Sequence, residues 1–321
     1  MPGLFRRHSG NPVLTIDQMP AGCASVFNPA ATLTDEGVVL LARVEDRRGI
    51  SSLWVARSSD GIGGWKVDPE PLLAPEHSWE EWGCEDPRIT WVPELGEWVI
   101  AYTGYSHVGP GVALARTGDF REATKIGLVL SPENKDAALF PCRFDGDWLL
   151  LHRPVSAQTG HIWLASSPDL VHWGRPRVVL ESRAPVRWDG TKVGAGAQPV
   201  ELPDGWLLVY HGVKLMVSGP VYRVGLALLH RERPWEVLAR TEDWVLGPET
   251  AYERTGDVPN VVFPCGAFVR GDELWVYYGA GDSSVGLATA PLAELLAALR
   301  AGRGDTEPGF GSTPPVTRFP S

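Results

Sequence analysis

The sequence predicts an all-β protein, a five-bladed β-propeller that ends in a short C-terminal helix. Strand-like segments rich in Val, Leu, Trp and Tyr recur along the 321 residues, they recur as five similar units, and helical periodicity is almost absent. Repeated units of three or four short strands, each roughly 50–70 residues long, are typical of propeller blades. A β-sandwich would not predict five equivalent units.

The first strand of each unit is marked by a proline. These prolines follow a polar or aromatic residue, and a proline pushes the residue before it toward an extended conformation. The five pairs are Asn28-Pro29, Asp86-Pro87, Phe140-Pro141, Gln198-Pro199 and Phe263-Pro264.

Two more strands follow in each unit. The second strands are predicted at 38–44, 98–102, 148–152, 206–210 and 274–278. The third strands end in Ala after Leu or Val, at 53–56, 112–115, 162–165, 224–227 and 285–288. Turn sequences at 58–61 and 166–169 then lead into a fourth strand.

One segment has a helical pattern. Pro291 to Arg300 starts with proline and is followed by Gly302, which predicts a short helix. The Gly- and Pro-rich tail, about 301–321, is expected to be loosely ordered. No shift in composition marks a boundary, so residues 1–321 are predicted to form a single domain.

Composition excludes several classes of protein. The net charge of −10 argues against a nucleic-acid partner, since phosphates favour basic faces. No apolar run approaches a membrane span, and the first residues lack the apolar core of a signal peptide. The four cysteines show no C-x-x-C spacing and are interpreted as reduced, buried thiols, so a cytoplasmic location is expected. The oligomeric state is left open, and a homo-oligomer is possible.

Polar residues stand at matching positions in several units. Any one of them is explained as well by a surface cap or an ion pair, but repetition favours a shared site, because the inner strands of a propeller line one channel. Beside the first strands lie Asn28, Asp86, Lys135, Asp136, Lys192 and Asn260; at or after the ends of the second strands lie Arg43, Tyr105, Arg153, His211 and Asp282.

The charges of this set are uneven. Lys135, Arg153, Lys192 and His211 are potential cations, which in an acidic protein indicates an anionic ligand. Asp86 and its neighbour Glu85 are acids opposite them. Aromatic residues such as Tyr105, Tyr222 and Phe263 suit a sugar face, although aromatics are also ordinary core residues. No P-loop, G-x-S-x-G, H-E-x-x-H or metal-ligand spacing is present, so no metal and no cofactor are expected.

Several segments together resemble glycoside hydrolase family 130, the β-mannoside phosphorylases. They are CEDPR (84–88), NKDAALFP (134–141), HRP (152–154), KVGAGAQP (192–199), YHG (210–212) and GAGD (279–282). The resemblance implies a five-bladed propeller that cleaves a terminal β-mannosyl residue with inorganic phosphate, inverting the anomeric centre to give α-mannose 1-phosphate.

The resemblance also implies roles for individual residues. Asp86 matches the general acid, which acts through the 3-hydroxyl of the bound mannose. The phosphate would be bound by Lys135, Arg153, Lys192 and His211. The sugar would be held by Asn28, Arg43 and Asp282, and we assign Glu85, Tyr105, Asp136, Tyr222 and Phe263 to sugar binding with them.

The chemistry agrees with phosphorolysis. An inverting hydrolase needs an acid and a base that activates water, whereas phosphate is already an anionic nucleophile that cations can hold in line. Two alternatives stay open: a β-mannosidase with Glu85, Asp136 or Asp46 as base, and a non-catalytic sugar-binding propeller. Propeller glycosidases with three carboxylates rank last, since they lack the cations. The acceptor sugar and its linkage, 1,4 or 1,2, depend on loops such as 75–82, 184–189 and 213–221.

Overall fold

The structure, a computed structural model, describes residues 3–156 and 159–301. These residues are all-β apart from the short helices α1 (Ala251–Arg254) and α2 (Leu292–Ala301) and the 3-10 turns η1 (Ile16–Gln18) and η2 (Ser78–Glu80). The predicted C-terminal helix is therefore confirmed, and it starts one residue later than expected because Pro291 still ends a strand. Residues 302–321 of the predicted tail lie outside the described residues.

The strands form five antiparallel units in chain order. Unit 1 holds β2 (Cys23–Thr34), β3 (Gly37–Asp46), β4 (Ser51–Ser58) and β5 (Lys66–Val67). Unit 2 holds β6 (Gly83–Val92), β7 (Glu97–Ser106), β8 (Gly109–Thr117) and β9 (Thr124–Leu130). Unit 3 holds β10 (Asn134–Phe144), β11 (Asp147–Pro154), β12 (Ile162–Ser167) and β13 (Gly174–Leu180).

Units 4 and 5 depart from this plan. Unit 4 holds β14 (Lys192–Ala195), β15 (Val200–Leu202), β16 (Gly205–Met216), β17 (Gly219–Leu229) and β18 (Val237–Arg240). Unit 5 holds β19 (Val262–Arg270), β20 (Glu273–Ala280) and β21 (Ser284–Pro291), and its fourth strand is β1 (Arg6–Arg7), from the other end of the chain. One parallel pair, Ser51 with Gly83, joins units 1 and 2 into a single sheet.

The first strand predicted around Pro199 is split in two. Residues 196–199 separate β14 from β15. At this break the guanidinium of Arg88 donates to the carbonyl oxygens of Ala195 and Gly196, at 3.0 and 2.9 Å. The N–H of Gly196 still donates to the Val209 carbonyl at 2.9 Å, and the pairing with β16 resumes in a shifted register at Val200, after Pro199, which has no N–H to donate.

The apolar core is divided into layers between successive units. Leu41 packs between units 1 and 2, Leu150 between units 2 and 3, and Leu151 between units 3 and 4. Leu40 faces the other way from Leu41 and packs with Leu287 of unit 5. Neighbouring residues of one strand thus serve two layers, because side chains alternate between the faces of a sheet, and both faces are buried here.

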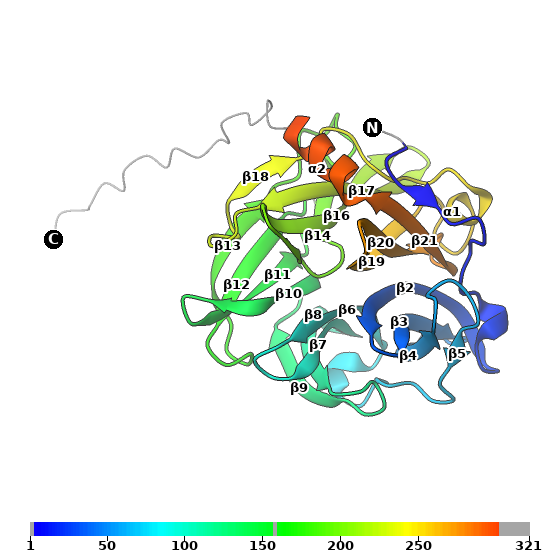
Figure 1. The fold of residues 1–321 in the computed structure, drawn as a ribbon. Coiled ribbons are helices and arrows are strands. Elements are labelled where there is room, and N and C mark those ends of the chain that lie inside the picture. The colour runs from blue at the N-terminus through cyan, green and yellow to red at the C-terminus, as the bar shows by residue number, and fades with distance from the viewer. Residues whose placement is uncertain (1–2, 157–158, 302–321) are drawn as a thin grey trace.

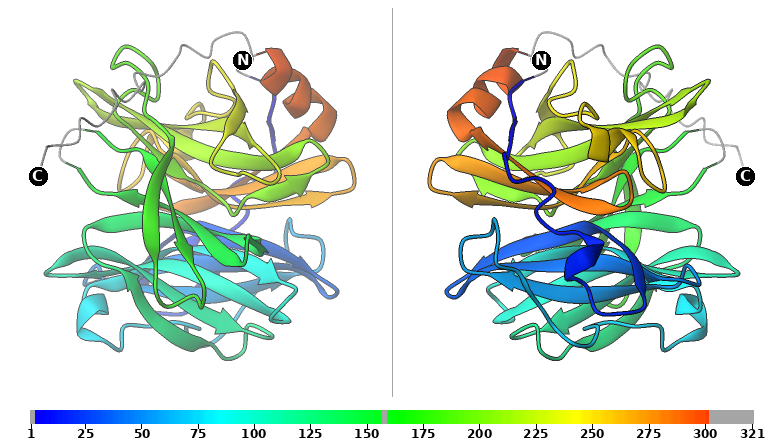
Figure 2. Two further views of the ribbon diagram at one scale, coloured as in Figure 1. Left: turned by 90° about the vertical axis from the view of Figure 1, so that its left-hand side faces the viewer. Right: turned by 90° about the vertical axis from the view of Figure 1, so that its right-hand side faces the viewer.

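The views of the ribbon agree with this layering. In Figure 1 the units follow one another around the molecule in chain order, from the blue β2 through the green β10 to the orange β19. The dark blue N-terminal segment runs from the orange strands to unit 1 in Figure 2, and α2 lies beside β21 and unit 4.

The four cysteines are free thiols. Cys84 and Cys265 are buried as predicted, Cys23 is partly buried, and Cys142 is exposed, so the prediction of a buried thiol is wrong for Cys142. Cys142 lies in β10 directly after Pro141, where the pairing of β10 with β11 shifts register and the strand runs out toward the surface. Within the described part of the chain, no helix has the length and apolar character needed to cross a membrane.

Candidate active site

Three first strands carry a polar residue at a bulge. Asn28, Asp86 and Asp136 adopt left-handed backbone conformations, with φ of 45°, 47° and 56°. At each one the pairing with the second strand shifts register. A bulge re-aims its side chain, and such strained positions collect at functional sites. Here two of these side chains meet, since Asn28 Nδ2 donates to Asp86 Oδ1 at 2.9 Å.

Asp86 and Glu85 share one arginine. Arg43 Nη1 lies 3.1 Å from Asp86 Oδ1, and Arg43 Nη2 lies 2.9 Å from Glu85 Oε1. Burial acts to raise the pKa of Asp86, but Arg43 and Lys135 outweigh it, so this pKa lies below its ordinary value. Burial and the charge of Asp86 raise the pKa of Glu85 instead, although Arg43 opposes them. The pKa values of these two adjacent carboxyls are thus shifted in opposite directions.

The four predicted cations, Lys135, Arg153, Lys192 and His211, gather around Asp136, and we call them the basic wall. Lys135 and Arg153 are cross-strand partners in unit 3. Arg153 Nε donates to Asp136 Oδ2 at 2.6 Å, and His211 Nε2 lies 3.4 Å from the same oxygen. Asp136 is buried, which disfavours its charge, but Arg153 and His211 hold its pKa far below the usual range. Asp136 is therefore an ionised anchor of the wall.

Lys192 enters the wall from unit 4. Burial and the charge of Arg153 lower the pKa of Lys192, so this ammonium lies in a site with excess positive charge. Its Nζ is 5.6 Å from the ring centre of Tyr222. Gly194, two residues on, has no room for a side chain: a Cβ there would meet Asp136 Oδ2 and His211 Cε1. The glycine is what lets β14 approach the wall so closely.

His211 differs from the predicted cation. It is fully buried, its ring centre lies 4.5 Å from that of Phe263, and burial lowers its pKa despite the nearby Asp136. His211 therefore contributes a neutral imidazole to the wall. Its charge was predicted from residue type alone, and only the depth of the site reveals the difference.

Arg88 is the central residue that sequence reasoning missed. Besides its bonds to unit 4, its Nη1 donates to the carbonyl of Asp86 at 2.6 Å and its Nη2 lies 3.6 Å from Asp136 Oδ1. Its guanidinium carbon also lies 5.5 Å from the ring centre of Phe263. One fully buried side chain thus ties units 2, 3, 4 and 5 together. Its place in CEDPR, beside the acid, was the available signal.

Two predicted residues lie at the border of the cluster. Asp282 has φ of 48°, and burial together with the charge of Asp86 raises its pKa to about 7. Tyr105 instead packs edge-on against Trp82, with ring centres 5.1 Å apart. Trp82 is 42% exposed, so this pair forms an aromatic rim rather than part of the buried network.

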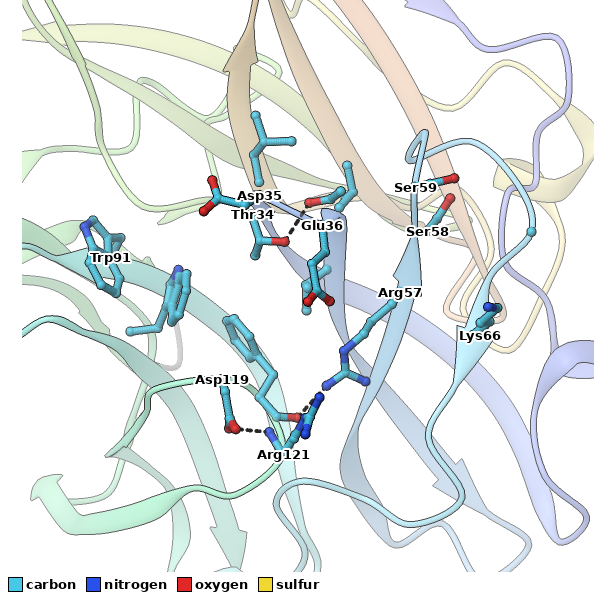
Figure 3. Close-up of a pocket in the computed structure, with 17 residues that line it drawn as sticks. Thr34, Asp35, Glu36, Arg57, Ser58, Ser59, Lys66, Trp91, Asp119 and Arg121 are labelled. Atoms are coloured by element: carbon cyan, nitrogen blue, oxygen red, sulfur yellow. Dashed lines mark hydrogen bonds between the residues drawn. The ribbon is translucent and has the colours of Figure 1, made fainter.

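The described residues contain no group of three or more His, Cys, Asp or Glu side chains arranged to hold a metal ion. A hollow of about 860 Å³ lies elsewhere, at the β2–β3 hairpin between units 1 and 2 (Figure 3). Thr34, Asp35 and Glu36 line it, with Trp91 to one side and Arg57 to the other. Thr34 is six residues beyond Asn28, roughly 20 Å along an extended strand. None of the predicted site residues lines this hollow.

Known proteins carry the same architecture. Residues 5–301 match a glycoside hydrolase 130 family model described as beta-1,4-mannooligosaccharide phosphorylase. The chain belongs to glycoside hydrolase family 130. The match runs from the N-terminal segment that supplies β1 to the end of α2, and so it covers all five units of this family 130 protein.

The relatives are named for different linkages. The 1,2-beta-oligomannan phosphorylase of Thermoanaerobacter sp. (strain X514) is 36% identical over 283 residues, which cover 85% of this chain and 92% of that protein. The beta-1,2-mannobiose phosphorylase from Listeria innocua, solved as a beta-1,2-mannobiose complex, has a TM-score of 0.84 and 29% identity, covering 92% of this chain and 99% of that one.

A further solved structure comes from work on the GH130 family of mannoside phosphorylases, which contains glycoside hydrolases that target beta-1,2 mannosidic linkages in Candida mannan. It is 27% identical, with a TM-score of 0.78, and covers 89% of this chain and 93% of that one. Membership of family 130 therefore leaves the choice between phosphate and water to the residues of the site.

Proposed function

We propose that this chain is an inverting β-mannoside phosphorylase, which transfers a terminal β-mannosyl residue to inorganic phosphate and releases α-mannose 1-phosphate. The observation that carries the proposal is the charge of the basic wall. Lys135, Arg153 and Lys192 are three cationic side chains around one ionised carboxylate, Asp136, so positive charge is in excess there even though His211 is neutral. This excess suits an anion such as phosphate, and burial makes it hard for water alone to solvate the cations.

Asp86 is the proposed general acid. In the free protein its pKa is low, because Arg43 and Lys135 outweigh the effect of burial. Phosphate bound at Lys135 and Arg153 offsets the charge of Lys135 and adds negative charge nearby, so the pKa of Asp86 rises when the nucleophile is present. The acid then delivers its proton to the leaving oxygen through the 3-hydroxyl of the mannose. Asn28, Arg43, Glu85 and Asp282 hold the sugar, and Tyr222 and Phe263 border it.

The pairing of the carboxylates disfavours the hydrolytic alternative. A base that activates water needs a pKa near the working pH. Arg153 and His211 hold the pKa of Asp136 far below that range. Asp46 is a surface carboxylate whose oxygen lies 2.7 Å from Arg48. Of the three bases named for that alternative, Glu85, whose pKa is raised, remains, but it lies beside the acid and on the same arginine. Asp282, with a pKa of about 7, also meets the pKa condition, but the charge of Asp86 that helps to raise it places this carboxyl on the side of the acid as well. Phosphate makes such a base unnecessary.

The five units are, in this proposal, the blades of one five-bladed propeller that forms a single catalytic domain over residues 1–321. The apolar layer between units 5 and 1 and the supply of β1 to unit 5 support closure of the ring. Phosphate is a co-substrate, and no cofactor is required. We further propose a cytoplasmic location, which the four free thiols support. The Trp82–Tyr105 rim is proposed to border the acceptor sugar.

The deciding experiment is an assay of β-1,2- and β-1,4-mannobiose with and without inorganic phosphate, following α-mannose 1-phosphate and free mannose separately. We expect sugar phosphate to form only with phosphate present and free mannose to stay at background. Equal mannose release in both conditions would identify a hydrolase, and no turnover of any mannoside would favour a sugar-binding protein. Reverse synthesis from α-mannose 1-phosphate with a panel of acceptors then identifies the acceptor and the linkage.

A further inference from the structure

One position of the second strands is tyrosine in three units and histidine in a fourth. In each case the residue pairs with the one directly before the Leu-Ala pair of the third strand, so the four positions are structurally equivalent. The pairs are Tyr102 with Ala113, His152 with Trp163, Tyr210 with Gly225, and Tyr278 with Gly286.

The three tyrosines make the same contact. Each hydroxyl donates to a buried carboxylate in the segment that leads into the first strand of its own unit. A cation from the fourth strand of that unit binds the same carboxylate. We call this arrangement the carboxylate tie. The ties are Tyr102–Glu80–Lys125, with both contacts at 2.8 Å; Tyr210–Asp189–Arg240, at 3.1 and 2.6 Å; and Tyr278–Glu253–Arg7, at 2.8 and 2.7 Å.

The cations are equivalent as well. Lys125, Arg240 and Arg7 pair across the strands with Ala115, Ala227 and Ala288, each the alanine of its Leu-Ala pair. The three carboxylates are fully buried. A buried carboxylate that keeps both a cation and a hydroxyl fixes the approach of the chain to the first strand, and losing one partner would leave a costly buried charge.

Unit 3 has the same position without any charge. His152 Nδ1 lies 3.0 Å from Asn134 Oδ1, and both residues are buried. Burial lowers the pKa of His152 to about 4, so its ring is neutral. The cation is absent too: the register shifts next to Ala165, and Arg175 turns outward to Asp147 with 82% of its side chain exposed. Carboxylate, cation and hydroxyl have all been replaced together.

Unit 3 also supplies two cations of the basic wall, Lys135 and Arg153. Asn134 directly precedes Lys135, His152 directly precedes Arg153, and Lys135 and Arg153 are cross-strand partners. A carboxylate at the place of Asn134 would attract these two cations, and the attraction would be strong because the surroundings are buried. The same carboxylate would repel an anion bound by them.

We propose that the His152–Asn134 pair is an uncharged replacement of the carboxylate tie. It holds the β10–β11 hairpin in place while keeping a further carboxylate away from Lys135 and Arg153, so that these cations bind the phosphate substrate. His152 and Asn134 are positioning residues in this account, which rests on the proposed phosphorolysis.

The test places a carboxylate at position 134, where three other units have one in the carboxylate tie. In Asn134→Asp we expect the apparent KM for phosphate to rise roughly tenfold, because the new carboxylate repels the bound phosphate across a partly screened site. The KM for the mannoside should change less than twofold. Inorganic phosphate should also bind more weakly in calorimetry. Because His152 could take up a proton and neutralise the new carboxylate, the double variant Asn134→Asp/His152→Gln should show the larger effect.

Two controls separate charge from structure. Asn134→Ala removes the hydrogen bond without adding charge, so its melting temperature should fall while its phosphate KM stays within about twofold. Asn11→Asp adds the same charge at a partly buried asparagine that contacts unit 5, 3.4 Å from the hydroxyl of Tyr278. It should leave the phosphate KM unchanged.

The inference is overturned if the wild type depends on phosphate but folded Asn134→Asp and the double variant keep its phosphate KM. It is equally overturned if Asn134→Ala or Asn11→Asp raises that KM as much. If the wild type neither binds nor uses phosphate, the proposed function fails first, and this inference fails with it.

Discussion

Asp136→Asn tests whether this carboxylate anchors the basic wall or acts as a base. Asp136 is 1% exposed and meets Arg153 at 2.6 Å, His211 at 3.4 Å and Arg88 at 3.6 Å. The amide keeps the shape but removes the charge, which leaves Arg153 buried without its ionic partner. Breaking a buried pair in this way costs about 3–5 kcal/mol. For a domain of about 300 residues, with an unfolding entropy of about 2.1 cal/mol/K per residue, that lowers the melting temperature by roughly 5–8 °C.

Thermal unfolding with and without phosphate is the assay. Phosphate bound to the folded state alone stabilises it by about 2.7 kcal/mol at a hundredfold excess over its Kd. Because Asp136→Asn raises the net positive charge of the wall, phosphate should protect the variant more than the wild type. Asp35→Asn, an exposed carboxylate, serves as the control and should change stability by less than about 0.5 kcal/mol.

The reasoning is refuted if Asp136→Asn has the same melting temperature as the wild type, or if phosphate raises the melting temperature of both proteins equally. A variant that stays stable but loses all turnover of a mannoside in the absence of phosphate would instead identify Asp136 as the base of a hydrolase.

Three further predictions concern single residues. Asp86→Asn should lower the phosphorolysis rate on an unactivated mannoside by ~10²–10⁴ with its fold retained, and near-full activity would exclude Asp86 as the acid. Arg153→Ala removes charge-assisted bonds worth about 1.5–3 kcal/mol, so the phosphate KM should rise about 10- to 100-fold; an unchanged KM would place the anion elsewhere. The pKa of Asp282 is raised to about 7 in the folded protein, so its stabilising contribution is complete below about pH 4 and is lost as the pH rises through 7. Asp282→Asn should therefore gain stability relative to wild type between pH 5 and 8, by up to about 4 kcal/mol, and a difference that is constant with pH would contradict this.

Much of the fold could be predicted from the sequence, because its signals are local. The second and third strands lie where alternating apolar runs and Leu-Ala pairs predicted them, and the C-terminal helix follows its proline. Asn28 and Asp86 could be selected because a proline follows each one. A strand, a turn or a bulge depends on a few neighbouring residues, and these stand together in the chain.

Only the tertiary structure decided how distant residues act on one another. Nothing in Arg6–Arg7 marks it as the fourth strand of unit 5, since its partner strand lies near the other end of the chain. Likewise His211 has the residue type of a cation but is neutral, and Arg88, which received no role in the CEDPR segment, joins four units. Charge state and contact depend on burial and on distances of a few ångströms between groups far apart in sequence, and these exist only once the units have packed together.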